Sequence, residues 1–199
     1  MKSRLLIVVA YCFSVAQPAF GQHFPVVVFK EAPEGVFSFT KKWDYKEDII
    51  KHDDGTFEKI DGEKIEPADT VHQYFTTNCK TNVQGGYTVK YCYAKRMGAT
   101  IRLNFSGGMP AYANEFNFTL SNNTVNFNPR VVYPELIMDE KIVYKVTLCQ
   151  LVLYQKNYAL ATNISGYIKA GFIEIIQNGK KGTKTNKYYL SGYFKTALN

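Results

Sequence analysis

The chain has 199 residues, of which 46% are hydrophobic and 21% charged, and its formal net charge is +7. This length suits one domain with a substantial core. No stretch after the first 21 residues is apolar enough for a membrane-spanning helix, which excludes a helical membrane protein.

Residues 1–21 have the pattern of a secretory signal peptide. Lys2 and Arg4 precede a short apolar run, and the run ends in Ala19-Phe20-Gly21. We expect cleavage before Gln22 and export to the periplasm or the extracellular space, where disulfides persist. Residues 22–199 are then expected to form a single β-rich domain.

The next segment is acidic. Glu31–Asp69 contains twelve acidic and six basic residues, whereas the chain from Thr70 onwards contains five acidic and fifteen basic residues. We expect residues 22–69 to form an acidic arm or extra hairpins. The asymmetry is compatible with an anionic partner for the basic part, with an arm that lies against the body, or, as the favoured reading, with solvated charge.

Trp43 and Tyr45 in "FTKKWDYKED" are the first candidate ligand-binding residues. An exposed Trp-Tyr pair suits a sugar ring or a protein partner, although a lone Trp is more often part of a core. Further on, Asp54-Gly55 and Asp61-Gly62 predict tight turns. One or two helical turns are expected around "PADTVHQYF".

Two cysteines flank a glycine pair in "CKTNVQGGYTVKYC". If Gly85-Gly86 forms a two-residue hairpin turn, Cys79 and Cys92 lie directly opposite each other at a non-hydrogen-bonded position. The sequence therefore predicts a disulfide between Cys79 and Cys92. Cys149, in "VTLCQLVL", is expected to be a buried thiol.

The remaining segments alternate apolar and polar residues. "NEFNFTL" and "VNFN" predict a hairpin through "SNNT", and a change of phase in "IVYKVTLCQLVLY" predicts a β-bulge near Cys149 and Gln150. "ISGYIKAGF" and "LSGYFKTAL" predict a further hairpin, with Gly166 opposite about Thr196 and Gly192 opposite about Ala170. The glycines in these strands indicate close backbone approach or a neighbouring aromatic ring over bare backbone.

The loop between these strands is rich in lysine. A mobile solvated loop is the favoured interpretation, and attraction to an anionic surface is the alternative. The lysines complete the set of candidate ligand-binding residues: Lys180, Lys181, Lys184 and Lys187. They lack interleaved aromatic residues, so a nucleic-acid partner is not expected.

The pattern as a whole predicts an all-β fold. An antiparallel β-sandwich of the Greek-key or jelly-roll kind is favoured, and a closed β-barrel is the alternative.

No nucleophile, zinc-protease or phosphate-loop motif is present in the sequence, so we expect no cofactor, no metal site and no assigned catalytic residue, and an enzyme is less favoured. The leading hypothesis is an exported binding protein whose partner is a protein, a glycan or an envelope component. A lipocalin-like barrel with a small apolar ligand is the alternative, and a hydrolase that uses His52 or His72 ranks third. An interior cavity would favour the ligand carrier, and a filled core would favour the binding protein. Four N-glycosylation sequons occur, at Asn104, Asn117, Asn122 and Asn163.

Overall fold

The computed structural model describes residues 22–46, 48–107, 114–133, 140–154, 162–178 and 182–199. Strands dominate these residues, and the all-β expectation is confirmed. The strands are β1 His23–Val28, β2 Trp43–Asp44, β3 Ile49–Lys51, β4 Phe57–Lys59, β5 Gln73–Tyr74, β6 Thr77–Thr81, β7 Tyr87–Val89, β8 Tyr91–Met97, β9 Thr100–Ser106, β10 Glu115–Ser121, β11 Thr124–Arg130, β12 Glu140–Leu153, β13 Asn163–Asn178 and β14 Gly182–Ala197. Short 3-10 helices occur at η1 Ser38–Lys41, η2 Pro67–Thr70 and η3 Val83–Gly85.

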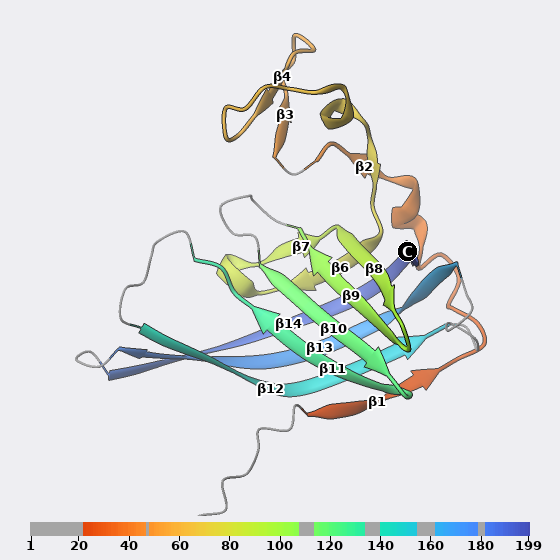
Figure 1. The fold of residues 1–199 in the computed structure, drawn as a ribbon, viewed down its shortest axis with the longest axis vertical. Coiled ribbons are helices and arrows are strands. Elements are labelled where there is room, and N and C mark those ends of the chain that lie inside the picture. The colour runs from red at the N-terminus through yellow and green to blue at the C-terminus, as the bar shows by residue number, and fades with distance from the viewer. Residues whose placement is uncertain (1–21, 47, 108–113, 134–139, 155–161, 179–181) are drawn as a thin grey trace, which may run out of the picture.

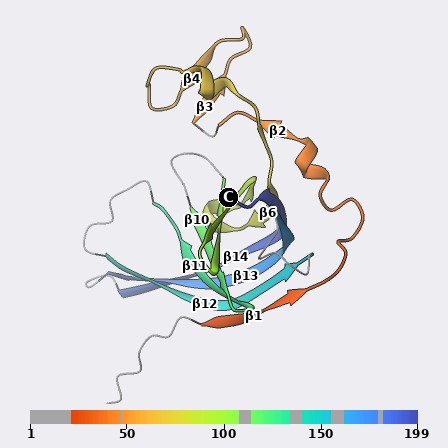
Figure 2. The ribbon, with the colours of Figure 1, turned by 45° about the vertical axis from the view of Figure 1, so that its right-hand side comes forward.

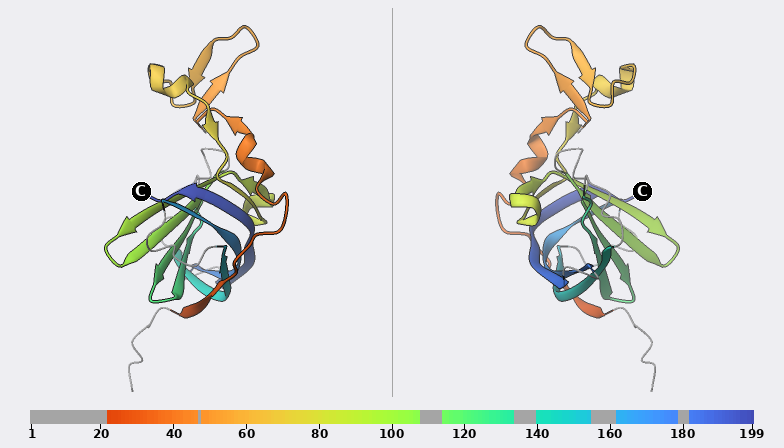
Figure 3. Two further views of the ribbon diagram at one scale, coloured as in Figure 1. Left: turned by 90° about the vertical axis from the view of Figure 1, so that its right-hand side faces the viewer. Right: turned by 90° about the vertical axis from the view of Figure 1, so that its left-hand side faces the viewer.

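Ten strands form one large sheet in the order β7-β6-β14-β13-β12-β1-β11-β10-β9-β8. Its ends come together because Ala94 of β8 pairs with Leu198, directly after β14. The backbone N–H of Arg96 donates to the carbonyl oxygen of Asn199 at 2.6 Å, and the N–H of Asn199 donates to the carbonyl oxygen of Ala94 at 3.1 Å. The sheet is therefore a nearly closed barrel (Figures 1 and 3). A barrel was the predicted alternative, and a two-sheet sandwich was the favoured prediction.

Phenylalanine side chains fill the barrel interior. Six of them are buried and contact one another as stacked, tilted or edge-to-face pairs: Phe105, Phe116, Phe118, Phe127, Phe172 and Phe194. The period-two alternation places these rings inside and the intervening polar residues outside. Such aromatic burial contributes to the hydrophobic stabilisation of the barrel, together with the buried Leu, Ile and Val side chains of the same core.

The first strand joins two strands that are far from it in sequence. His23–Pro25 pairs antiparallel with β11, and Val26–Val28 pairs parallel with β12. β1 thus links the two sides of the sheet at the point where the chain passes from β11 to β12.

The two "SGY" segments form the expected hairpin, β13 and β14, with a register different from the expected one. Gly166 lies opposite Phe194 and Gly192 opposite Ile168, because the strands continue to the pair Asn178 and Gly182 and the turn is shorter than expected. An added Cβ would lie 2.9 Å from the Phe194 ring at Gly166 and 2.1 Å from the carbonyl oxygen of Asn78 at Gly192. Each glycine therefore permits a close approach that any other residue would prevent.

The β-bulge in β12 lies between Val146 and Leu148, slightly before the predicted position at Cys149 and Gln150. Tyr144 and Val146 pack against the core, Leu148 is exposed, and Cys149 and Leu151 are buried. The extra residue of the bulge shifts the alternation by one position, so that Cys149 and Leu151 face the core, as the sequence pattern indicated.

The predicted disulfide between Cys79 and Cys92 is wrong. Cys79 pairs with Val89 on β7, and the thiols of Cys79, Cys92 and Cys149 are free and buried. The hairpin does not turn on Gly85-Gly86 alone, because the wider turn over 82–86 includes η3 and the positive φ of Gln84. Cys92 consequently lies beyond β7, on β8, where it pairs with Phe105.

The segment from Ser38 to Tyr74 forms a small unit that projects from the barrel, and we call it the arm (Figures 1 and 2). It contains two short two-stranded sheets, β2 with β5 and β3 with β4. The arm projects from the barrel instead of lying along the basic body, which was one of the arrangements that its charge suggested.

Candidate functional site

An aromatic cluster occupies the middle of the arm. Trp43 of β2 lies opposite Tyr74 of β5 and stacks on His72, with ring centroids 3.6 Å apart and an interplanar angle of 13°. Tyr45 approaches the Trp43 ring at 6.1 Å and the Phe57 ring at 5.0 Å, in both cases edge-on. We call Trp43, Tyr45, Phe57, His72 and Tyr74 the aromatic cluster.

Hydrogen bonds fix the centre of the aromatic cluster. Lys51 Nζ donates to the Tyr45 hydroxyl at 3.3 Å, and this hydroxyl lies 3.1 Å from His72 Nε2. Lys51 also lies over the Tyr45 ring, 5.6 Å from its centroid, as a cation–π contact. These contacts hold His72 parallel to the indole of Trp43.

A buried carboxylate supports the aromatic cluster from the adjacent η2 turn. Asp69 accepts hydrogen bonds from Lys46 Nζ at 2.7 Å and from the backbone N–H of Glu66 at 2.9 Å, and Lys59 Nζ lies 3.1 Å away. Lys46, the Glu66 N–H and Lys59 hold the pKa of the Asp69 carboxyl well below its usual range. In a unit with a small apolar core, this ion-paired carboxylate ties β4 to the segment that carries His72.

The base of the arm is packed on the barrel. Phe37 contacts the rings of Tyr154 and Tyr193 edge-on, at 6.2 and 6.4 Å. On the other side, Lys90 of the barrel forms an ion pair with Asp44 at 3.0 Å. Contacts on both sides restrict how the arm can move relative to the barrel.

The arm exposes apolar side chains. The exposed fractions of Trp43 and Tyr74 are 46% and 58%, and Ile50, Ile60 and Val71 are exposed as well. Trp43 is therefore a surface residue, although a core position was the favoured interpretation of its sequence. Exposed aromatic residues within an acidic surface are suited to binding apolar and cationic groups of a partner.

A groove lies between the arm and the barrel. Its volume is about 340 Å³, and its lining includes Lys46 and Gln73 from the arm and Tyr91, Tyr93 and Ser106 from the barrel. The groove is open, has charged and aromatic walls, and includes Gln73, the residue between His72 and Tyr74 of the aromatic cluster.

The candidate lysines lie apart from the aromatic cluster. Lys184 and Lys187 are exposed on β14, in the half of this strand that pairs with the end of β13. Lys180 and Lys181 lie outside the described residues. Only Trp43 and Tyr45, of the residues proposed from sequence, come together in the structure.

Sequence reasoning missed the partners of Trp43. The sequence indicated His72 only as a possible hydrolase residue, but it stacks on the indole. Among the described residues, no three His, Cys, Asp or Glu side chains gather as metal ligands. The pairing of β2 with β5 across 29 residues creates the contact, and no local motif signals such a pairing.

A second polar site lies inside the barrel. Glu174 of β13 is 0% exposed, and its Oε2 accepts from the Tyr133 hydroxyl at 2.5 Å and from Asn186 Nδ2 at 2.9 Å. Among the residues that the structure describes, none forms a hydrogen bond with Glu174 Oε1. Burial and the neighbouring Glu174 raise the pKa of the Tyr133 hydroxyl, and burial raises the pKa values of Tyr144 and Tyr188.

The fold and the aromatic cluster define an all-β barrel protein with a projecting, aromatic-bearing arm. No family model matches the chain, and neither a curated protein nor a solved structure matches it significantly. Within the described ranges, no helix has the length and apolar character needed to cross a membrane.

Proposed function

We propose that the chain is an exported binding protein that uses the exposed aromatic cluster of its arm to hold a protein partner. The observation that carries this proposal is the exposure of Trp43 and Tyr74 on an acidic arm, which the ion pair between Lys46 and Asp69 stabilises. Aromatic residues are the ones most often found at the energetic centres of protein interfaces.

The charge of the arm supports a basic partner. Ser38–Tyr74 has a formal charge of −4, from its ten acidic and six basic residues. Asp44 follows Trp43 and is exposed, so a carboxylate that also pairs with Lys90 of the barrel lies beside the aromatic cluster. An apolar centre with a charged rim is typical of a protein-binding surface. The partner surface should therefore combine an apolar anchor with Lys or Arg side chains.

The packed phenylalanine side chains among the described interior residues support a binding protein over a carrier of a small apolar ligand. Phe105, Phe118 and Phe194 occupy the centre of the barrel and are fully buried. A carrier needs a cavity of several hundred Å³ lined by apolar side chains. The signal-peptide pattern of residues 1–21 supports the exported location, which is part of this proposal.

Selection of peptides from a displayed random library on the immobilised mature protein tests the proposal. We expect the selected peptides to combine aromatic or aliphatic residues with Lys or Arg. Replacing both Trp43 and Tyr74 with Ala should weaken their binding by about 30-fold or more, since one central aromatic residue contributes about 2 kcal/mol. Binding should also weaken as salt is added.

Tyr189→Ala is the matched control, because Tyr189 is 45% exposed on the barrel strand β14 and has a similar aromatic area. It should bind the selected peptides as the wild type does. Peptides that bind the double variant and the wild type equally well would refute the proposal. Selective binding of neutral glycans on a glycan array, with no peptide selected, would replace the protein partner with a carbohydrate.

A further inference from the structure

The four sequons have different structural surroundings. Asn104 of β9 and Asn117 of β10 lie directly opposite each other, and Asn104 Nδ2 donates to Asn117 Oδ1 at 2.8 Å. Both side chains are half-buried. A glycan on Asn104 Nδ2 would replace one of the two N–H donors of that amide, and a glycan on Asn117 Nδ2 would disturb its contact with Glu115. Either sugar would crowd the opposite side chain in the middle of a continuous sheet.

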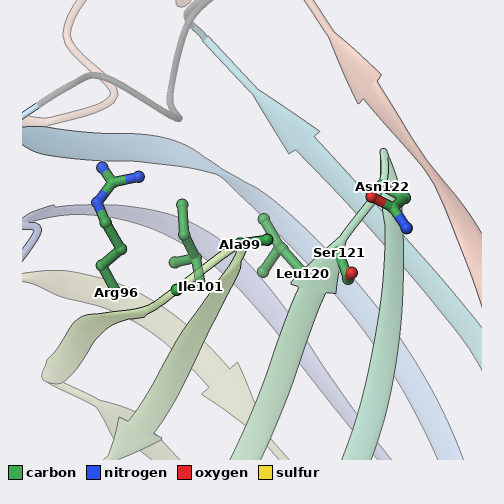
Figure 4. A pocket seen from close by; sticks show the side chains of 7 residues that line it. Arg96, Ala99, Ile101, Leu120, Ser121 and Asn122 are labelled. Carbon is green, nitrogen blue, oxygen red and sulfur yellow. The ribbon is translucent and has the colours of Figure 1, made fainter.

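Asn122 lies instead at the tip of the β10–β11 hairpin. Ser121 pairs with Thr124, so Asn122 and Asn123 form a two-residue turn with φ values of 49° and 59°. These values suit a type I′ turn, in which asparagine is favoured and side chains project from the end of the sheet. Asn122 is exposed, and Figure 4 shows it at the end of the hairpin.

The surface beside Asn122 leaves room for a sugar. A hollow of about 170 Å³ adjoins it, lined by Arg96, Ala99, Ile101, Leu120 and Ser121 among others (Figure 4). Arg96 comes from β8, which is separated from β10 by β9, and its guanidinium group is a multiple hydrogen-bond donor of the kind that binds sugar hydroxyls.

We propose that the exported chain carries an N-linked glycan on Asn122, whereas Asn104 and Asn117 stay unmodified. The inference rests on the export part of the proposed function and is independent of the binding role of the arm. The sugar donor is an oligosaccharide linked to a lipid pyrophosphate in the endoplasmic reticulum. Asn122 Nδ2 loses one proton and bonds to C1 of the sugar, the bond from C1 to the phosphate oxygen breaks, and the lipid pyrophosphate leaves with the proton.

The position of Asn122 also separates the glycan from the aromatic cluster. The β10–β11 turn lies at the end of the hairpin away from the arm, as Figure 1 shows. A glycan there would cover the barrel end and leave the arm open to its partner.

The test is secretion of the full-length chain from cultured insect cells, once with its own leader and once with a leader of the host. Peptide-N-glycosidase F treatment in heavy-oxygen water, followed by peptide mass mapping, identifies each modified asparagine. We expect a glycan on Asn122 that is lost in Asn122→Gln and in Thr124→Ala. Asn123→Gln, the neighbouring turn residue, is the matched control and should keep it. The Asn163→Gln variant distinguishes a glycan on the exposed Asn163 from the glycan on Asn122.

Secreted protein with an unmodified Asn122 would overturn the proposal, and so would a glycan on Asn104 or Asn117. Failure of the chain's own leader to direct secretion would overturn it for the native chain, because the donor would never be reached. The host leader then shows whether Asn122 itself is an acceptor. Peptide binding by the arm is measured separately, so loss of that binding leaves the result at Asn122 intact.

Discussion

At the scale of single residues, positions inside the barrel wall and core carry the sharpest constraints. Gly192 approaches the backbone of Asn78 and Cys79 on β6, and Glu174 places a buried carboxylate beside partly buried tyrosines. The three cysteines lie in the same interior as thiols. A testable prediction follows for each of these positions.

Gly192→Ala should destabilise the fold by about 3 kcal/mol or more, because the new Cβ would lie 2.1 Å from the Asn78 carbonyl oxygen and 2.5 Å from Cys79 Cα. Both are backbone atoms that cannot rotate away. Gly171→Ala is the control, since its nearest atom is the side-chain oxygen of Thr147 at 3.2 Å. Urea unfolding measures both, and equal stabilities would contradict the close approach of β14 to β6.

Glu174→Ala should destabilise the protein by about 3 kcal/mol, since the partly buried Tyr133 hydroxyl and Asn186 amide would each lose their acceptor. Glu174→Gln should cost less, because the carboxamide oxygen still accepts hydrogen bonds. Urea unfolding of the two variants gives the difference. If alanine were tolerated as well as glutamine, the hydrogen bonds of Glu174 would not contribute to stability.

The thiols of Cys79, Cys92 and Cys149 should not react with an aromatic disulfide reagent in the native protein at neutral pH. Burial raises the pKa values of Cys79 and Cys149 to about 12 and that of Cys92 well above its ordinary 9.0, so the reactive thiolate is scarce. In denaturant, the mature chain should release three equivalents. Release of only one equivalent per chain would indicate that two of the three cysteines had formed a disulfide.

At the scale of elements, the arm differs from the barrel in what holds it together. The barrel buries phenylalanine side chains, whereas the arm depends on the ion pairs and hydrogen bonds of Asp69. Trp43 is the only tryptophan of the chain, so its fluorescence reports on the arm alone.

We expect the arm to loosen at acid pH before the barrel unfolds. The folded-state pKa of Asp69 lies below its ordinary value of 3.8, so its contribution is complete above pH 3.8 and is lost as the pH falls further. Trp43 emission should shift in that range while the far-ultraviolet dichroism of the barrel persists. Asp69→Asn should show the shifted emission already at neutral pH. A single transition seen by both signals would mean that arm and barrel unfold together.

At the scale of the whole molecule, we expect the free energy of unfolding of the barrel to fall at strongly alkaline pH. Burial raises the pKa values of Tyr133, Tyr144, Tyr154 and Tyr188 above the ordinary value of 10.0. Their contribution to stability is complete below pH 10 and decreases as the pH rises, because the unfolded chain then releases protons that the folded chain retains.

The urea midpoint should therefore fall steadily above pH 10, and part of the tyrosine absorbance change should appear only with unfolding. Tyr133→Phe should reduce the slope of stability against pH, since one of the shifted groups is gone. A midpoint that is independent of pH in this range would show that the tyrosines ionise equally in both states.

The sequence by itself determined the local features of this protein. Period-two alternation identified the β10–β11 hairpin, and the two "SGY" segments identified β13 and β14 as neighbours. Turn residues were predicted correctly at Asp54-Gly55, where Asp54 accepts from the Thr56 N–H. These features depend on residues close together in the chain, so backbone conformation and side-chain alternation are sufficient to predict them.

Only the tertiary structure decided the features that join distant segments. The meeting of β8 with the end of β14 closes the barrel, and β1 pairs with both β11 and β12. The same is true of the candidate site, where the sequence indicated Trp43 and Tyr45 but not the His72 ring that stacks on Trp43. The disulfide prediction failed because it assumed the turn type, and a wider turn shifted the register. Such pairings depend on the packing of the whole chain, since a strand edge or an aromatic face can accept many partners and only the complete set of contacts selects one.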